Sequence, residues 1–170
     1  MAGSMARLRI LLIGAALGAA CAAPPPPPEP ESLRLAFSTL NDVAIPGVAG
    51  PYDDADVYGW TGSGFTRILD ASEVGLAGGA DVDGLLVVDA DTAYLSFAGN
   101  AGTNVPGVGS VQDEDVVRYD AGVWSLVFDG SDVGLGETNA EDVDAFEVLG
   151  DGSIVVSTFG TPDLPDLAGE

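Results

Sequence analysis

The sequence predicts an all-β protein built from repeats of about 60 residues, and two observations lead to this fold class. Each repeat contains four short β-type runs separated by Gly, Asp, Asn and Pro, which is the spacing of an all-β chain. The stretch 105–149 also has a diverged counterpart earlier in the same chain. We therefore expect two four-stranded repeats plus the first strand of a third. Four strands per unit are typical of a propeller blade, and an antiparallel β-sandwich or barrel is the alternative.

Aligning the chain with itself locates the copies. An offset of 59 residues aligns Val57, Phe65, Asp70 and Leu76 with Val116, Trp124, Asp129 and Leu135. Offsets of 60 and 61 align the flanking segments, namely Leu35, Phe37 and Pro46 with Leu95, Phe97 and Pro106, and 81–83 with 142–144. The small changes of offset place the insertions in loops. The β-repeat domain (33–170) thus divides into repeat 1 (33–91), repeat 2 (92–151) and a partial repeat 3 (152–170), which we expect to be cut off after its first strand.

Residues 1–20 predict a secretory signal peptide. Arg7 and Arg9 precede an apolar run at 10–20, which is too short to span a membrane and is typical of a signal segment. Cys21, the only cysteine, follows this run in a context similar to a bacterial lipobox, so we predict that it becomes the lipidated first residue. The protein is then exported and held in the cell envelope as a membrane-anchored lipoprotein. Ordinary cleavage around Ala20-Cys21-Ala22 is the alternative, and it predicts a freely secreted protein.

Residues 21–32 include five consecutive prolines, which form neither helix nor sheet, so this segment predicts an extended tether. The part that follows is strongly acidic. All 27 acidic residues lie after the signal segment, which contains two of the five arginines, so the remaining chain has a formal charge of −24. This charge argues against nucleic acid and anionic membrane surfaces as partners. A solubilising, self-repelling surface is its simplest interpretation.

The expected strands of repeat 2 are 93–97, 116–119, 123–128 and 143–149. Alternation along 123–128 places Trp124, Leu126 and Phe128 on one face, and the aromatic side chains Trp124 and Phe128 are predicted to lie in the core. Stacking of a sugar on Trp60 or Trp124 is the alternative role for the tryptophans. Arg67 occupies the position of Leu126 in repeat 1, which predicts either a sheet edge or a buried ion partner.

Three runs carry a resemblance to a known kind of repeat: DEDVVRYD at 113–120, WSLVFDGSDVGL at 124–135 and DVDAF at 142–146. They resemble an uncharacterised acidic β-repeat family of secreted or surface-attached bacterial proteins. Repeat 1 departs from the pattern with DADVYGW and DVDGL, and repeat 3 lacks everything after its first strand. The resemblance implies β-repeats and an extracytoplasmic location, and it supplies no catalytic residues.

The chain has no His and no Lys, and its single Cys is assigned to lipidation. It therefore lacks the usual base for a Ser or Cys nucleophile and the soft ligands of zinc sites. We predict a non-catalytic surface module that binds a protein or glycan partner or has a structural role. A carboxylate-dependent enzyme resembling a glycoside hydrolase is the alternative, because that reaction needs only two acids at a suitable separation.

Acidic residues recur in corresponding loops of the two copies, where they are candidate ligands for calcium. In each Asp-x-Asp motif the carboxylates project from one side of an extended chain, and calcium prefers such hard oxygen ligands. Asx turns and solvated loop ends are the competing interpretation. The candidate metal ligands, strongest in repeat 2, are Asp113, Asp115, Asp142, Asp144, Asp129, Asp132, Asp54, Asp56, Asp81 and Asp83.

Overall fold

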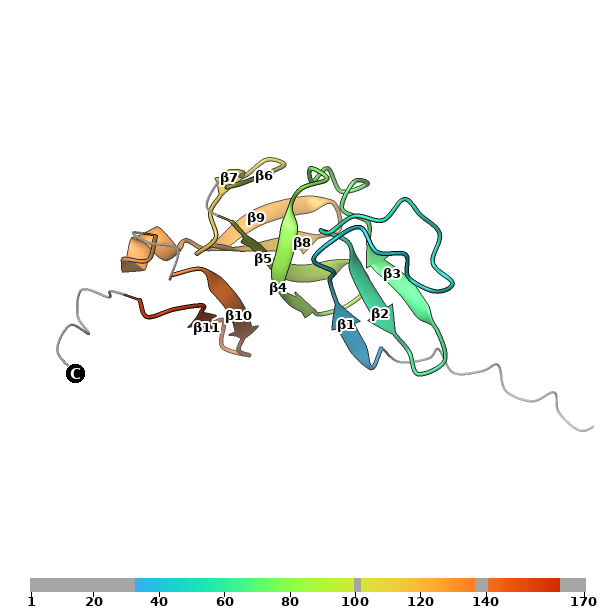
Figure 1. Ribbon diagram of the computed structural model, residues 1–170. Helices are drawn as coiled ribbons and strands as arrows, with labels where there is room; N and C mark the ends of the chain where they lie inside the picture. Colours follow the sequence, from blue (N-terminus) through green and yellow to red (C-terminus); the bar gives the residue numbers. More distant parts are fainter. Residues whose placement is uncertain (1–32, 100–101, 137–140, 163–170) are drawn as a thin grey trace, which may run out of the picture. The chain divides into compact units, whose positions relative to one another are not determined.

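The computed structural model of the protein describes residues 33–99, 102–136 and 141–162 (Figure 1). The predicted signal peptide, Cys21 and the proline tether lie outside the described residues, and so does the end of repeat 3. The described residues all belong to one unit of the chain. Within them, no helix combines the length and the apolar character that a membrane crossing requires.

The described residues form eleven β-strands and one short 3₁₀ helix. The first five strands are β1 (Leu35–Phe37), β2 (Val57–Trp60), β3 (Phe65–Leu69), β4 (Asp81–Val87) and β5 (Thr92–Ala98). They are followed by β6 (Thr103–Val105), β7 (Gly109–Val111), β8 (Val116–Asp120) and β9 (Val123–Phe128). The helix η1 (Gly130–Val133) and the strands β10 (Val143–Val148) and β11 (Ile154–Thr158) complete the order.

These strands form four antiparallel sheets, which confirms the all-β fold class. The sheet orders are β1-β2-β3, β4-β5-β8-β9, β6-β7 and β10-β11, and none of these sheets closes into a barrel within the described residues. Figure 1 shows β4, β5, β8 and β9 side by side, and β10 packs beside β4. The strands expected in repeat 2 agree with β5, β8, β9 and β10 to within one residue at each end.

The grouping of the strands differs from the expected one, in which the fourth run of a repeat completes its own unit. β4, the fourth run of repeat 1, pairs with β5 of repeat 2, and β10 pairs with β11 of repeat 3. A short turn explains this pairing. Val88 N–H donates to the Thr92 carbonyl (3.0 Å) and Asp91 N–H donates to the Asp89 side chain (2.9 Å), which closes a hairpin. Each of these sheets is therefore shared between two sequence repeats.

The strand pairings of the two copies have the same register. The β2–β3 and β8–β9 pairings coincide at an offset of 59 residues, and each has a β-bulge at the same place, after Val57 and after Val116. The β4–β5 and β10–β11 pairings coincide at an offset of 61, with matching bulges after Val82 and after Val143. Because bulges are specific local features rather than defects, their recurrence extends the sequence similarity to the backbone.

The structure aligns the first strand of each copy differently from the sequence comparison. Phe37 lies opposite Tyr58, and it is Leu95, not Phe97, that lies opposite the equivalent Val117. The offset between β1 and β5 is therefore 58 rather than 60. A shift of two residues keeps each side chain on the same face of a strand, so the hydrophobic pattern alone could not reveal it.

With this offset Ser38 corresponds to Ser96, and the two serines make the same contact. The Ser38 hydroxyl lies 2.6 Å from the Val82 carbonyl oxygen, and the Ser96 hydroxyl lies 2.9 Å from that of Val143. Val82 is in β4 and Val143 is in β10, each the first strand of the following sheet. Each serine thus links one sheet to the next.

The hydrophobic core repeats as well. Val57, Leu76 and Val82 are buried in the main cluster, which extends to Trp124. A smaller cluster is built on the equivalent residues, which are Val116, Leu135 and Val143. The second cluster lies beside the two-stranded sheet, which supplies Val143, Phe146 and Val156 to it. The size of each core therefore follows the number of strands available to cover it.

The expected core face of β9 is only partly correct. Trp124 is buried, and its indole N–H donates to the Val74 carbonyl (3.1 Å). Leu126, which shares this face with Trp124, is 39% exposed, although it lies opposite the buried Val117. β9 is the outer strand of its sheet, so no further strand covers Leu126.

The β6–β7 hairpin was not expected from the sequence. Its turn at Pro106-Gly107 is closed by a hydrogen bond from Val108 N–H to the Val105 carbonyl (3.1 Å), with Gly107 at a φ of 75°. The matching turn of repeat 1, around Gly47, has the same hydrogen bond, but no strands flank it. The short strands were missed because only three residues form each of them.

Candidate functional site

Asp56 lies at the centre of the acidic loop of repeat 1, and its side chain is fully buried. One carboxylate oxygen accepts hydrogen bonds from Asp53 N–H (3.1 Å) and the Tyr58 hydroxyl (2.7 Å), and the other accepts from Ala71 N–H (3.0 Å). Asp56 therefore joins the loop before β2 to the loop after β3. Burial of Tyr58 and its hydrogen bond to Asp56 raise the pKa of the phenol to about 12.

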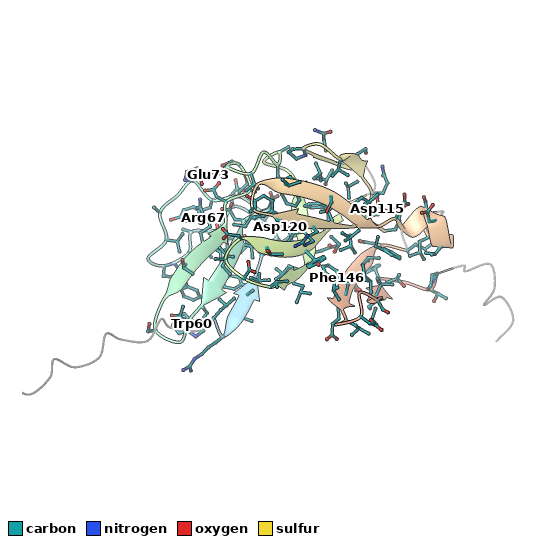
Figure 2. All side chains as sticks on the ribbon, turned by 180° about the vertical axis from the view of Figure 1, so that it is seen from behind. Trp60, Arg67, Glu73, Asp115, Asp120 and Phe146 are labelled. Carbon is teal, nitrogen blue, oxygen red and sulfur yellow. The ribbon has the colours of Figure 1, made fainter. Side chains whose placement is uncertain are left out.

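Asp115 occupies the equivalent place in repeat 2 and makes the equivalent backbone contacts. Its Oδ2 accepts from Gln112 N–H (2.9 Å) and its Oδ1 accepts from Gly130 N–H (3.0 Å), at the start of η1. Figure 2 shows Asp115 close to this helix. The separations of 3 and 15 residues are those found around Asp56. Two of the candidate calcium ligands thus act as acceptors for backbone amides, as expected of loop-organising aspartates.

The acidic loops of the two repeats differ because an arginine lies beside the loop of repeat 1 and an uncharged residue occupies that position in repeat 2. The side chain of Arg67, labelled in Figure 2, is 14% exposed. Its Nε lies 3.3 Å from Asp56 Oδ2, and its Nη1 forms an ion pair with Asp70. Arg67 also donates to the carbonyls of Ala49 (2.9 Å) and Pro51. Both predicted alternatives for Arg67 hold, because β3 is an outer strand of its sheet and Arg67 pairs with the buried Asp56. The corresponding position in repeat 2 is occupied by Leu126, which carries no charge.

This difference alters the electrostatics of the loops. Burial acts to raise the pKa of Asp70, but hydrogen bonds, one of them from Arg67, outweigh it and hold that pKa below its ordinary value. In repeat 2, burial and neighbouring carboxylates raise the pKa of Asp115. Burial, a hydrogen bond with Asp113 and the nearby carboxylates raise the pKa of Glu114 to about 7. The loop of repeat 2 therefore gathers negative charge that no arginine at this position offsets.

The structure also brings together two acids from different repeats. Asp83 in β4 and Asp142, just before β10, are joined by a hydrogen bond between their carboxyl groups. The Ser96 hydroxyl lies 2.8 Å from Asp83 Oδ1. Burial, and then the charge of Asp83, raises the pKa of Asp142 to about 7, while burial raises the pKa of Asp83. Such a pair shares one proton, because two ionised carboxylates in contact repel each other strongly.

The predicted calcium ligands are only partly gathered in one place. The charges of Asp83, Asp113 and Asp144 act on Asp142, which makes Asp142 the centre of a four-residue acidic group. Asp129 instead caps η1, where its side chain accepts from Ser131 N–H (3.1 Å). Asp132 lies in the first turn of η1, Asp54 interacts with Asp53, and the charge of Asp83 contributes to a raised pKa of Asp81. Among the described residues, no three acidic side chains form a metal-binding cluster, and calcium binding stays a prediction.

An open groove of about 550 Å³ lies beside the outer part of the first sheet. Its lining combines apolar and polar side chains, which are Leu33, Thr61, Thr66, Arg67, Ile68, Val87, Val88, Asp89 and Ala90. Grooves with this mixed character are the usual places for small ligands. The groove joins β3 to the turn between β4 and β5, and no single stretch of sequence indicated it.

Both tryptophans are used in packing. The Trp60 ring lies 4.7 Å from the ring of Phe65, and the Trp124 ring lies 4.9 Å from that of Tyr119. These contacts favour the core interpretation over sugar stacking, most clearly for Trp124, which is buried.

Sequence reasoning also missed two buried glutamates. Glu114 is 5% exposed, and Glu141, 1% exposed, accepts a hydrogen bond from Gly136 N–H (3.1 Å). Both flank candidate aspartates and have no counterpart in repeat 1, so a comparison between the copies could not select them. Their proximity to the Asp-x-Asp motifs was the available signal.

The geometry thus offers a pair of carboxylate-centred loops, an acidic group around Asp142 and an open groove. No protein-family model, curated protein or solved structure matches this chain. The resemblance to an acidic β-repeat family stays a prediction, and the function has to be argued from the residues themselves.

Proposed function

We propose that the protein is a non-catalytic, exported surface module with a binding or structural role. The observation that carries this proposal is the use of Asp56 and Asp115 as acceptors for backbone amides, at the same spacings in both repeats. A buried carboxylate that joins two loops is committed to holding the fold together. The abundance of acidic residues is therefore accounted for in part by loop structure, without a reaction.

Blade-like packing of the repeats is part of the proposal. The sheet β4-β5-β8-β9 has the four antiparallel strands of a propeller blade. By register, β1-β2-β3 corresponds to the last three strands of this sheet and β10-β11 corresponds to the first two. An experimental structure in which the two larger sheets stack face to face would support the sandwich alternative instead.

Export and lipidation rest on the sequence of the first 32 residues, which gives a signal segment, Cys21 and a proline tether in that order. A lipid on Cys21 would hold the acidic domain at the membrane without a spanning helix. Mass spectrometry of the protein from its native cell envelope tests this. A mature chain beginning at Cys21 with added acyl mass supports the proposal, and an unmodified chain beginning at Ala23 supports free secretion.

For a binding role, the open groove is the proposed contact site for a protein or glycan partner. Its apolar members, among them Ile68 and Val87, give contact area, and Thr66 and Asp89 give hydrogen-bonding groups. The test is a screen on glycan and protein arrays with the natural chain and with Ile68→Asp. Binding that is lost in the variant supports this site, whereas equal binding places the contact elsewhere.

Calcium is proposed as a stabilising ion at the acidic group around Asp142. Asp113, Asp144 and Asp83 contribute charge there, whereas both oxygens of Asp115 already accept backbone N–H groups. Binding to the native state alone raises stability by about 2.7 kcal/mol when the ion is at a hundred times its Kd. Melting in chelator, in millimolar calcium and in sodium chloride of equal ionic strength tests this. A calcium-specific increase that Asp113→Asn with Asp142→Asn removes supports the site, and equal increases in both salts indicate screening.

The alternative function, a carboxylate-dependent hydrolase, has one observation in its favour. The Asp83–Asp142 pair combines a shared hydrogen bond with a pKa of about 7 for Asp142, as found in acid–base pairs. Glycoside hydrolysis, however, requires carboxyl groups at least ~5 Å apart, and hydrogen-bonded groups are closer than that. Hydrolysis of polysaccharides or esters that Asp142→Asn abolishes would establish the alternative.

A further inference from the structure

Two strands that occupy equivalent places in their sheets have one unpaired edge each within the described residues. β5 pairs with β4 on one side and with β8 on the other. Its equivalents are less complete, because β1 pairs only with β2 and β11 pairs only with β10. Unpaired strand edges are sites where another strand can add, since their backbone groups lack partners.

The two edges also expose apolar side chains. Leu33 and Leu35 at β1 are 42% and 55% exposed, whereas Ala93, the equivalent of Leu35 in β5, is 3% exposed. On the other side Val155 in β11 is 54% exposed, and Phe159 just after it is 77% exposed. The apolar character of both edges favours association with a further strand over exposure to water.

The complete sheet specifies which strand fits the free edge of β11. The free side of β11 corresponds to the side of β5 that pairs with β8, so its complement is a strand of the β8 type. β2 is the other strand of this type, and its pairing with β3 has the register of the β8–β9 pairing. The β2 edge is at present covered by β1.

We propose that a second copy of the chain completes these sheets: β11 of one copy replaces β1 on β2 of the other. The product is a four-stranded sheet, β10-β11-β2-β3, formed across the two copies. Its register follows from the β5–β8 pairing, which places Ser153 opposite Thr61, Ile154 opposite Trp60 and Val156 opposite Tyr58. Exchange of an equivalent element between identical chains is a low-cost route to a dimer.

β1 is the strand that yields, because it is the weaker of the two. It pairs with β2 through three residues, whereas β11 pairs with β10 through five. A groove of about 280 Å³ that Leu33, Leu35 and Val87 help to line also lies beside β1. β11, by contrast, keeps its pairing with β10 in the exchanged sheet and gains a second partner strand.

The exchange also suits the number of strands. When each copy donates β11 and accepts β11, the described strands of the pair make four four-stranded sheets, and the association closes at two copies. Four is the smallest number of blades in a typical propeller.

The proposal rests on the blade-like assignment but not on export, calcium or the absence of catalysis. Disulfide trapping in the full chain tests it, with Cys21→Ser to remove the natural thiol. Thr61→Cys is combined with Ser153→Cys, which are opposite each other only in the exchanged sheet. The matched control combines Thr61→Cys with Arg34→Cys, which face each other when β1 stays on β2. Opposed residues of antiparallel strands lie within disulfide distance.

We expect light scattering of the Cys21→Ser chain to give twice the chain mass at micromolar concentration. On oxidation, Thr61→Cys with Ser153→Cys forms a covalent dimer, and mixing the two single-cysteine variants gives the same mixed dimer. A parent of single-chain mass, or an Arg34–Thr61 disulfide formed within one chain while the Ser153 variant stays monomeric, overturns the proposal. Circular dichroism matching that of the parent confirms that each variant is folded. A monomeric result would not contradict the proposed structural role of Asp56 and Asp115. That role is tested separately, by the free energy of unfolding of variants at these two positions.

Discussion

Asp56→Asn and Asp115→Asn change the same position of the two repeats while keeping the shape of the side chain. In either variant one carboxylate oxygen becomes an NH₂ group, so a loop amide loses its acceptor. The variants differ in the charges nearby. Asp56 lies 3.3 Å from Arg67 Nε, whereas the charges that act on Asp115 are carboxylates. We therefore expect unequal losses of stability at two positions with matching backbone hydrogen bonds.

The expected magnitudes follow from these contacts. Removing one partner of a buried ion pair costs about 3–5 kcal/mol, and Arg67 keeps its pair with Asp70, so we expect about 3 kcal/mol for Asp56→Asn. For Asp115→Asn, reduced repulsion offsets part of the lost hydrogen bond and leaves about 1 kcal/mol. In a domain of this size, 1 kcal/mol corresponds to about 3 °C, so the melting temperature should fall by about 9 °C and about 3 °C.

Urea unfolding followed by tryptophan fluorescence measures both losses, since Trp60 and Trp124 report on different sheets. Asp42→Asn, at an exposed loop position, is the control for the general effect of removing one negative charge. Equal losses at Asp56 and Asp115, or a larger loss at Asp115, would refute the argument that Arg67 distinguishes the two loops.

Three further predictions concern the same loops. Because the folded-state pKa values of Asp142 and Glu114 are raised from 3.8 and 4.5 to about 7, the folded state binds more protons, so stability should be greatest near pH 4 and decrease as the pH rises to about 7. Melting in chelator across this range measures the decrease, which Asp142→Asn should reduce; a rise in stability over the range would contradict the assignment. Leu126→Arg supplies repeat 2 with the cation of repeat 1 and should raise the free energy of unfolding by up to about 1 kcal/mol, because the position is partly exposed. A Cβ at Gly130 would lie 2.6 Å from the Glu114 carbonyl oxygen, so Gly130→Ala should cost about 1–3 kcal/mol. Gly150→Ala, where a Cβ meets nothing within 4 Å, should change stability little, and equal effects of the two glycine variants would count against the packing argument.

The sequence predicted the strands of repeat 2 well, because alternation and turn residues are local signals. It could not predict that β4 leaves its own repeat to pair with β5, since strand grouping depends on which turns are tight. The sequence left open whether Arg67 lies at a sheet edge or has a buried ion partner. The strand pattern does not indicate which residue a charged side chain pairs with. The exposure of Leu126 could not be predicted, because the pattern does not reveal that β9 is an outer strand.

The candidate site was predicted in outline only. The corresponding aspartates were identified correctly as equivalent positions, and Asp56 and Asp115 do have equivalent contacts. The pairing of Asp83 with Asp142 joins residues from different repeats, so a comparison that treats the copies as separate units cannot find it. The groove was missed for a similar reason, since its walls come together only in three dimensions.

The sharing of sheets between sequence repeats has a consequence for folding cooperativity. Repeat 2 cannot form its four-stranded sheet until β4 of repeat 1 is in place, and Ser38 and Ser96 link each sheet to the strand that starts the next. In a simple repeat array, units unfold separately when the interfaces between them are weak compared with the units themselves. Here the boundary between sequence units runs through the interior of a sheet, so loss of one unit removes a strand from its neighbour. The described domain should therefore unfold in a single step, with both tryptophans reporting the same transition.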